Sequence, residues 1–486
     1  MIELSLTDLL KITGGHATAS VAPDTVVSSA TTDSREVVQG SLFVAKPGEF
    51  SDGHAFIDSA LAAGAVLALA ERVTYDEHRQ EHPAVIVDDA VEAMGRIAAH
   101  IVNYLKAKNN AEVIGITGSA GKTTTKDLLA AILSEVAPTV SPIGSYNGEV
   151  GVPLTVFNAT DDTKYLVIEM GATGLGHLTY LTDMVHPKIG VVLCVGTAHA
   201  GEFGGVDNIE KAKGELVEAL GADGVAVLNA EDPRVARMAQ RAAGAAVRYF
   251  GSGSAKPENA GVWASDVLVN SNGQPELTLE FPNGYSQRIT SGLLGRHHVA
   301  NILAAANAAN ELGVAPELIA RVLDGRTAGS RWRMERIERA DGVSIINDAY
   351  NANPESMRAA LVTLAELGLP SADAPARRTW AVLGEMLELG EESIYQHDLL
   401  GRMAVRMNIK KLVVVGRGAK AAYNSAVLEG SWGDEAYYVE DAQEARALLE
   451  EKLEPGDIVL FKSSNGAGLR HLGDQIAASG QEGSRA

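Results

Sequence analysis

The stretch Val113-Ile-Gly-Ile-Thr-Gly-Ser-Ala-Gly-Lys-Thr-Thr-Thr125 predicts a buried strand, a tight turn and a helix in immediate succession. Such a turn points backbone N–H groups and a helix N-terminus at an anion. Lys122 would reach the outer phosphates of a nucleotide, and the Thr123 hydroxyl would hold a divalent cation. The stretch therefore predicts an ATP- or GTP-binding loop inside a parallel α/β fold.

This loop is shorter than the common phosphate-binding loop. The common pattern places a glycine six residues before the lysine, where this chain has Ile116. The sequence thus has the form Thr-Gly-x-x-Gly-Lys-Thr, and a glycine-rich turn without a ligand is the alternative interpretation. The candidate nucleotide contacts of the loop are Gly118, Ser119, Ala120, Gly121, Lys122, Thr123 and Thr124.

Length and composition limit the class of protein. At 486 residues and 46% hydrophobic content, the chain is expected to fold into two or three domains. The net charge of −21 argues against a nucleic-acid partner, which requires clustered Lys and Arg. No signal peptide and no apolar run of about 18 residues is present, so we expect no membrane span. A single cysteine, Cys194, is interpreted as a buried strand residue, and the chain is expected to be soluble and cytoplasmic.

Alternating strand and helix patterns predict an α/β protein of three domains. Residues 1–92 form a small α/β N-terminal domain. Residues 93–328 combine a parallel sheet, covered by helices on both faces, with a β-rich insert. Residues 329–486 form a Rossmann-like domain that lacks a phosphate loop. The predicted strands are 25–27, 41–45, 66–70, 84–87, 113–117, 165–169, 189–195, 224–228, 343–346, 380–383, 411–415 and 458–461.

Two polar residues follow consecutive apolar strands along the chain in the predicted central sheet. Glu169 ends one strand, and His199 follows the next. The carboxyl ends of parallel strands meet at one edge of a sheet, so both side chains are expected beside the phosphate loop. Together with Thr123 they are the candidate ligands of Mg²⁺. A surface Glu and a structural loop His are the alternatives.

Two basic pairs have two interpretations each. Lys211 and Lys213 lie on a predicted helix, where a solvated face is the favoured interpretation from spacing alone. Arg331 and Arg333 lie at the boundary between the second and third domains. An arginine there would either close over a bound phosphate or form a linker salt bridge.

Two polar segments are further candidates for ligand contacts. Thr32-Asp-Ser-Arg35 precedes a turn and suits either an anion site or a capped surface turn. The segment Asn347-Asp-Ala-Tyr-Asn-Ala-Asn353 follows a buried strand and offers groups for ribose, amide and carboxylate contacts. Asn353 also precedes Pro354 as a helix N-cap, so part of this segment is structural.

The chain resembles the Mur ligase family over nearly its whole length. The resemblance implies a monomeric ATP- and Mg²⁺-dependent ligase of peptidoglycan synthesis, which serves cell wall biogenesis, cell shape and cell division. The last two motifs below resemble the branch that joins D-alanyl-D-alanine to UDP-N-acetylmuramoyl-tripeptide through an acyl phosphate. The matching motifs are Thr32–Arg35 with Asp52–His54, the phosphate loop, Tyr146–Pro153, Glu169–Ala172, Ala212–Glu215, Asp348–Pro354, and Leu383–Gly390 with His397.

The resemblance also implies roles for individual residues. The implied catalytic residues are Lys122, His199, Lys213 and Arg333. Thr123 and Glu169 would hold one Mg²⁺ ion and His199 a second, while Lys213 aligns with a lysine that can be carbamylated. Besides the phosphate loop, Asn301 would contact adenine and Asp348 the ribose. The implied substrate contacts are Ser34, Arg35 and Asn147 for the UDP-sugar peptide, and Asn351 and Asn353 for the dipeptide.

Two departures and two rivals accompany the resemblance. The chain has His298 where the family has Asn, and Asn465 lies in a segment that more often carries Arg, so neither receives a role. One rival is another amide ligase of the superfamily, similar to folylpolyglutamate synthase. The other is a nucleotide-gated binding protein that hydrolyses ATP without forming a product. Phosphate release that requires both proposed substrates would separate the ligase from both rivals.

Overall fold

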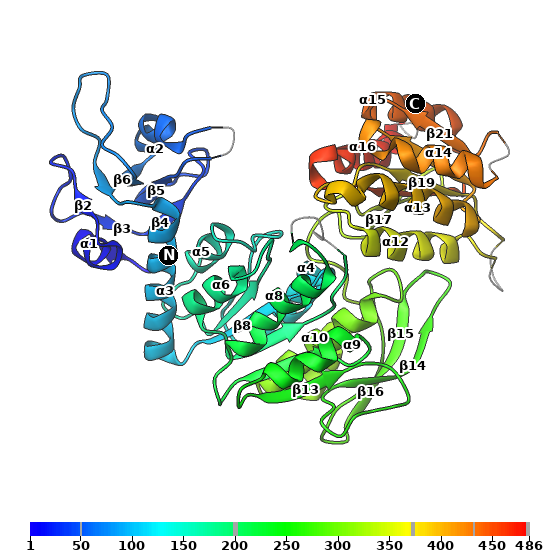
Figure 1. Ribbon diagram of the computed structural model, residues 1–486, viewed down its shortest axis with the longest axis horizontal. Coiled ribbons are helices and arrows are strands. Elements are labelled where there is room, and N and C mark those ends of the chain that lie inside the picture. Colours follow the sequence, from blue (N-terminus) through cyan, green and yellow to red (C-terminus); the bar gives the residue numbers. More distant parts are fainter. Residues whose placement is uncertain (49–50, 198–202, 371–374, 431–432, 483–486) are drawn as a thin grey trace.

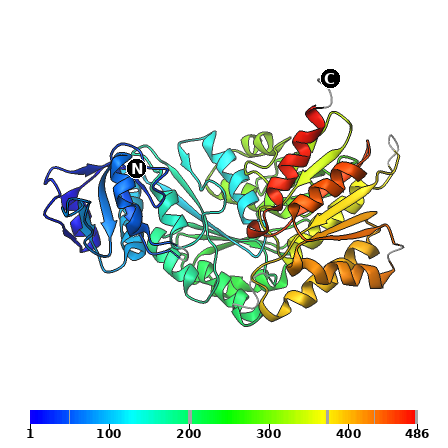
Figure 2. The same ribbon diagram turned by 90° about the horizontal axis from the view of Figure 1, so that it is seen from above.

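The computed structural model describes residues 1–48, 51–197, 203–370, 375–430 and 433–482. Figure 1 shows three α/β bodies, with the N-terminal body at the left, the C-terminal body at the upper right and the central body between and below them. Figure 2 shows the same succession from above. The predicted three-domain α/β architecture is confirmed, while the boundaries at residues 92 and 328 stay predictions.

The N-terminal body contains a five-stranded sheet in the order β2-β7-β6-β5-β4. All pairs in this sheet are parallel except β2 with β7. Helices α1 and α3 cover one face, and α2 covers the other. The elements are β1 (Leu4–Ser5), α1 (Leu6–Thr13), β2 (His16–Ala17), β3 (Val26–Val27), β4 (Ser29–Thr31), β5 (Ser41–Ala45), α2 (Ile57–Ala62), β6 (Ala65–Ala70) and β7 (Ala84–Ile86).

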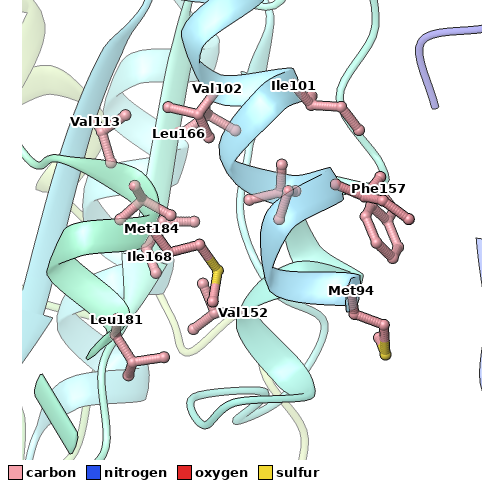
Figure 3. Close-up of a cluster of buried hydrophobic side chains, with 14 of the residues drawn as sticks. Met94, Ile101, Val102, Val113, Val152, Phe157, Leu166, Ile168, Leu181 and Met184 are labelled. Atoms are coloured by element: carbon pink, nitrogen blue, oxygen red, sulfur yellow. The ribbon is translucent and has the colours of Figure 1, made fainter. Parts of the chain in front are cut away.

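Helix α3 (Ala90–Asn109) connects the N-terminal body to the central body. It begins where the Asp89 carboxylate accepts the N–H groups of Val91 and Glu92, and it ends at Asn110 in the left-handed region. One end of its buried face contacts α1, and the rest packs against α5 and α6 of the central body. Figure 3 shows part of this core, in which Val102 of α3 lies beside Leu166 of the central sheet. One continuous apolar cluster therefore joins the two bodies.

The central body is organised around an all-parallel sheet in the order β13-β12-β11-β8-β10-β9. Helices α3, α5, α6 and α8 cover one face, and α4, α10 and α11 cover the other, as predicted. The elements are β8 (Glu112–Thr117), α4 (Lys122–Ser134), β9 (Thr139–Val140), α5 (Gly151–Val156), β10 (Tyr165–Glu169), α6 (His177–Val185), β11 (Ile189–Val192), α8 (Val206–Glu218), β12 (Val225–Asn229), α9 (Pro233–Ala236), β13 (Ala246–Phe250), α10 (His298–Glu311) and α11 (Pro316–Leu323).

The interpretation of Cys194 as a buried strand residue was wrong. Strand β11 ends at Val192, and the chain then bends towards the phosphate loop. Cys194 is only half-buried, and its thiol lies 3.6 Å from the carbonyl oxygen of Ala120. Leu193 and Cys194 line a cavity, and sequence pattern alone does not distinguish an apolar segment of this kind from a strand.

The predicted β-rich insert forms a three-stranded antiparallel sheet in the order β14-β15-β16. Both Asn-Gly signals lie at its turns, where Gly273 and Gly284 have φ values of +76° and +88°. Leu277 and Leu279 on the inner face pack into the core beside α10. The strands are β14 (Trp263–Val269), β15 (Pro275–Glu280) and β16 (Ser286–Thr290).

The C-terminal body contains a six-stranded sheet in the order β17-β18-β22-β19-β20-β21, parallel except for the edge strand β17. Helices α12, α13 and α14 cover one face, and α15 and α16 cover the other. The elements are β17 (Glu335–Glu338), β18 (Ser344–Asn347), α12 (Pro354–Leu367), β19 (Thr379–Leu383), α13 (Ser393–Arg406), β20 (Lys411–Val415), α14 (Lys420–Glu429), β21 (Ala436–Val439), α15 (Ala442–Lys452), β22 (Ile458–Lys462) and α16 (Leu469–Glu482). None of the helices in the described ranges combines the length and apolar character that crossing a bilayer requires.

Candidate active site

The phosphate loop lies at the carboxyl end of β8, where it is tied to the neighbouring strand end. The N–H of Ser119 donates to the carbonyl of Cys194 at 3.0 Å, and the Ser119 hydroxyl accepts the N–H of Gly196 at 2.8 Å. Gly121 has a φ of +84°, and a Cβ there would collide with the Asn301 carboxamide, so glycine is required. The Lys122 ammonium donates to the carbonyl of Gly118 at 2.8 Å. Hydrogen bonds to the segment that follows β11 thus fix the backbone of the loop, and the Lys122 side chain lies against this backbone.

Thr123 and Glu169 meet at the edge of the sheet, as predicted for a metal site. The Thr123 hydroxyl donates to Glu169 Oε2 at 2.9 Å, and both residues are almost fully buried. Asn147 donates from Nδ2 to the other carboxylate oxygen at 2.8 Å. His199, the third predicted ligand, lies outside the described residues. Among the described residues no group of three or more acidic, His or Cys side chains forms a metal cluster.

The two arginines of the linker have different partners. Arg333 crosses to the central body, where its Nη2 donates to Thr123 Oγ1 at 3.0 Å and to Ser145 Oγ at 2.8 Å. Its guanidinium also lies 4.4 Å from the ring centre of Tyr350. Arg331 instead forms a salt bridge with Asp474 at 3.0 Å. Arg331 thus forms the predicted salt bridge, whereas the contact of Arg333 with a bound phosphate stays a prediction.

A cavity of about 340 Å³ lies between the central and C-terminal bodies. The phosphate loop and Glu169 form its wall on one side, and the segment after β18 forms the opposite wall. Gly118, Ser34, Arg35 and Lys213 do not line it. The predicted site residues that do line it are Ser119, Ala120, Gly121, Lys122, Thr123, Thr124, Asn147, Glu169, Asn301, Arg333, Asp348, Asn351 and Asn353.

Two side chains at the start of α12 bring the C-terminal body against the phosphate loop. Asn353 donates from Nδ2 to the carbonyl of Ser119 at 3.1 Å, while its Oδ1 caps the helix by accepting the N–H of Ser356 at 2.8 Å. Glu355 Oε1 accepts the N–H and the hydroxyl of Thr197 at 2.6 and 2.8 Å. Asn353 therefore caps α12 as predicted. Its contact with Ser119 also joins the C-terminal body to the central body, so the two bodies are closed over the phosphate loop.

His298 and Asn301 form the end of the cavity at the N-terminus of α10. Asn301 donates from Nδ2 to His298 Nδ1 at 3.0 Å, so the imidazole proton resides on Nε2. Burial lowers the pKa of His298 well below its usual value, and the ring is neutral. Its Nε2 is buried and has no hydrogen-bond partner among the described residues. His298 therefore presents an unused donor next to the cavity.

Lys213 is buried, which contradicts the solvated face predicted from spacing. On α8, Ile209, Ala212, Lys213 and Leu216 share the buried face, whereas Lys211 is exposed as predicted. This spacing of i, i+3, i+4 and i+7 is the apolar stripe of a helix, so the pattern itself contained the signal. Desolvation, reinforced by the charge of Lys122, lowers the pKa of Lys213 to about 7. Its amine is therefore substantially neutral at physiological pH.

Ser34 and Arg35 lie in a self-capped turn of the N-terminal body. Asp33 accepts the backbone N–H of Arg35 and pairs with its guanidinium at 2.6 Å, and the Arg35 side chain is 86% exposed. Nearby, burial raises the pKa of Tyr146, and the charge of Glu36 raises it further. The structure shows the capped turn and does not bring Ser34 or Arg35 to the cavity.

Models of known families match all three bodies. The Mur ligase family, catalytic domain matches residues 26–102, the Mur ligase middle domain matches 116–309, and the Mur ligase, glutamate ligase domain matches 332–465. A UDP-N-acetylmuramoyl-tripeptide--D-alanyl-D-alanine ligase of Mycobacterium tuberculosis is 41% identical, with 98% of each chain covered. The chain belongs to the Mur ligase family.

Solved structures share the architecture of this Mur ligase. A crystal structure of MurF from Acinetobacter baumannii matches with a TM-score of 0.83 and 30% identity, over 98% of this chain and 99% of that one. MurF from Thermotoga maritima in complex with ADP matches with a TM-score of 0.74 and 26% identity, over 94% of this chain and 98% of that one. The three-domain fold and the family resemblance are therefore confirmed.

Sequence reasoning missed several residues that line the cavity of this Mur ligase. Tyr350 and Glu355 lie in or directly after the polar segment that follows β18, so that segment was the available signal. Ser145 and Asn229 are isolated polar residues at loop or strand ends and carried no sequence signal. Lys462 ends an apolar strand, and a lysine that is buried there requires a partner from elsewhere in the chain.

Proposed function

We propose that this Mur ligase joins D-alanyl-D-alanine to UDP-N-acetylmuramoyl-tripeptide, with conversion of ATP to ADP and phosphate. The observation that supports this most directly is the cavity between two bodies, in which Lys122, Glu169 and Arg333 converge around the phosphate loop. The Mycobacterium relative has this activity in its name, and the Thermotoga structure contains ADP. The reaction belongs to the cytoplasmic stage of peptidoglycan synthesis, and through it to cell shape and cell division.

We assign one ligand to each predicted domain. Residues 1–92 bind the UDP-sugar peptide through Ser34 and Arg35, and Asn147 of the central domain is a further contact for this substrate. Residues 93–328 bind ATP through the phosphate loop. Residues 329–486 bind the dipeptide, with Asn351 and Asn353 as contacts, and we propose that the chain acts as a monomer.

The nucleoside part of ATP is assigned to the cavity next to the N-terminus of α10. Asn301 contacts adenine there and Asp348 contacts the ribose, because both residues line the cavity. The neutral His298 ring with its unused Nε2 donor suits an acceptor on the base.

The first chemical step is phosphoryl transfer from ATP to the terminal carboxylate of the tripeptide. The carboxylate oxygen attacks the γ-phosphorus, ADP leaves, and an acyl phosphate forms. Lys122, the loop N–H groups and Arg333 surround the phosphates and offset the repulsion between two anions. The dipeptide amine, as the free base, then attacks the acyl carbon, and phosphate leaves from the tetrahedral intermediate.

Thr123 and Glu169 fit the requirements of a Mg²⁺ site. They present a hydroxyl and a carboxylate 2.9 Å apart, and Mg²⁺ is commonly held by one or two such oxygens together with phosphates and water. When bound, the ion supplies charge neutralisation at the phosphates. We assign His199 to a second Mg²⁺ ion because it follows β11 in the sequence, and β11 is the neighbour of β8 in the sheet.

Contacts between the two bodies exclude water from the acyl phosphate. Asn353 reaches Ser119, and Glu355 holds Thr197, so α12 covers the phosphate loop. Water would otherwise hydrolyse the activated carboxyl group before the amine arrives. The side chains that close the cavity therefore serve product formation as well as binding.

Phosphate release that depends on both substrates is the expected result with the purified chain. The measurement follows phosphate with ATP and Mg²⁺ alone, with one substrate added, and with UDP-N-acetylmuramoyl-tripeptide and D-alanyl-D-alanine together. Sustained release only in the last mixture, with a ligated product, supports the proposal. Release that is indifferent to the substrates indicates an ATPase without product, and release that requires a folate and glutamate indicates the folylpolyglutamate rival.

Carbamylation of Lys213 is the second expected result. Only the neutral amine attacks CO₂, and the pKa of Lys213 is lowered to about 7. The neutral fraction therefore rises about tenfold between pH 6 and pH 8. The ¹³C NMR carbamate signal of enzyme in ¹³C-bicarbonate should be strong at pH 8 and weak at pH 6, and removal of CO₂ should lower activity reversibly. Lys211→Ala is the matched control and keeps the signal, whereas a signal that persists in Lys213→Ala would contradict the assignment.

A further inference from the structure

Lys462, at the end of β22, is a buried cation to which the proposed mechanism gives no role. Its side chain is 2% exposed, and its ammonium donates to Asp348 Oδ2 at 2.5 Å. It also donates to the carbonyl oxygens of Asn351 and Asp348 at 3.1 and 3.4 Å. The three donors of the ammonium are thus all directed at one segment, the loop that follows β18. Desolvation lowers the pKa of Lys462, and the charge of Asp348 opposes this effect.

Asp348 contacts both Lys462 and the linker between the central and C-terminal bodies. Its second carboxylate oxygen, Oδ1, accepts the N–H of Met334 at 3.0 Å. Trp332 and Met334 have φ values of +58° and +52°, in the left-handed region that costs free energy for residues other than glycine. Such a conformation persists only where surrounding contacts hold it. The Asp348–Met334 hydrogen bond holds one of the two left-handed residues.

Arg333 lies between these two left-handed residues. The turn directs its side chain away from the C-terminal body, to Thr123 and Ser145 beside the phosphate loop. An ordinary extended linker would point alternate side chains in other directions and would not place Arg333 there. The position of Arg333 therefore depends on Met334, Asp348 and Lys462 in succession.

We propose that Lys462 is a positioning residue, which holds Asp348 so that the linker turn keeps Arg333 at the phosphates. The inference rests on the proposed ligase function and adds a residue to its machinery. The same ammonium fixes the carbonyl of Asn351, on the side of the cavity assigned to the dipeptide.

A role in stability alone does not account for this choice of residue. Well-packed apolar residues in place of a buried ion pair are often as stable or more stable. Both oxygens of the Asp348 carboxylate are in use, since Oδ1 accepts from Met334 and Oδ2 accepts from Lys462. An apolar residue in place of the lysine would leave Oδ2 of this buried group without its partner. The lysine at this position is therefore explained by the need to hold the Asp348 side chain in place.

The test is a double-mutant cycle between Lys462 and Arg333, with kcat for substrate-dependent phosphate release as the readout. Lys462→Met should lower kcat by about 10²-fold in the otherwise unchanged chain, since a displacement of about 1 Å costs that much. In the Arg333→Ala background the same substitution should lower kcat by less than about threefold, because the group that it positions is gone. In the Arg331→Ala background the full effect should remain.

Equal fold losses in all three backgrounds would overturn the inference, because Lys462 would then act independently of Arg333. Lys462→Arg, which keeps a charge opposite Asp348, covers the case in which Lys462→Met does not fold. Its smaller loss of kcat must also shrink in the Arg333→Ala background, and an unchanged loss would overturn the inference as well. Failure of the proposed function is a different result, because the unsubstituted chain would then show no substrate-dependent release.

Discussion

The Lys122→Ala variant is expected to lose substrate-dependent phosphate release by about 10²- to 10³-fold, the loss that follows removal of one preorganised donor to a developing charge. Lys122 lines the cavity, and its ammonium lies over the loop carbonyl of Gly118, 2.8 Å away. The step that it serves brings a carboxylate against a polyphosphate, so loss of a cation raises the energy of the transition state directly. Steady-state kinetics with both substrates measure the effect.

The control for Lys122→Ala has to separate a lost charge from a lost fold. Lys188→Ala removes a lysine from the opposite end of the central sheet, where its partner is Glu112 at 2.9 Å. Both variants should unfold cooperatively near the melting temperature of the unsubstituted chain, and only Lys122→Ala should be inactive. Ligation retained in Lys122→Ala would refute the assignment of the phosphate site.

Arg333→Ala should lower kcat by roughly 10³-fold or more, within the range of an arginine that stabilises a transferring phosphoryl group. Arg333 comes from the linker, yet its Nη2 reaches Thr123 and Ser145 on the central body. Its Nε is buried and has no hydrogen-bond partner among the described residues, which leaves a donor for a ligand. Single-turnover measurement of ADP formation with the tripeptide tests the phosphoryl-transfer step itself.

Arg331→Ala is the matched control, two residues away on the same linker. Arg331 pairs with Asp474 of the C-terminal body and does not line the cavity. Its removal should change kcat by less than about threefold, since partly exposed salt bridges contribute little. Equal losses in the two variants would mean that the linker conformation matters and the Arg333 charge does not.

Strands buried on both faces were the most predictable part of the fold. Strands β8 and β10 were located within one residue at each end, because continuous apolar runs bounded by turn signals leave few alternatives. The edge strands β4 and β9 were missed. Ser29–Thr31 has little intrinsic strand preference and is ordered by its neighbour, as the 2.7 Å contact between the Ser29 and Ser41 hydroxyls shows.

The candidate site was predictable where its residues follow the ends of parallel strands. The phosphate loop and Glu169 needed only the rule that the carboxyl ends of parallel strands lie at one edge of a sheet. Arg333, Asp348 and Asn301 were placed by family resemblance, since their meeting depends on how two bodies pack. Lys462 was missed because its partners are over 100 positions away in the chain, as with Asp348 at a separation of 114. The helical spacing of Lys213 indicates a buried position. Sequence reasoning placed it in solvent because lysine is normally exposed.

The shared core along α3 determines which parts of the molecule lose structure together. Since its apolar face belongs to both the N-terminal and the central cluster, separating these bodies would expose a surface that neither can cover alone. We therefore expect these two bodies to unfold as one cooperative unit. The C-terminal body has two apolar clusters of its own and connects to the central body through the linker. We expect it to unfold separately, once its contacts with the central body, such as that of Arg336 with Asn272, are broken.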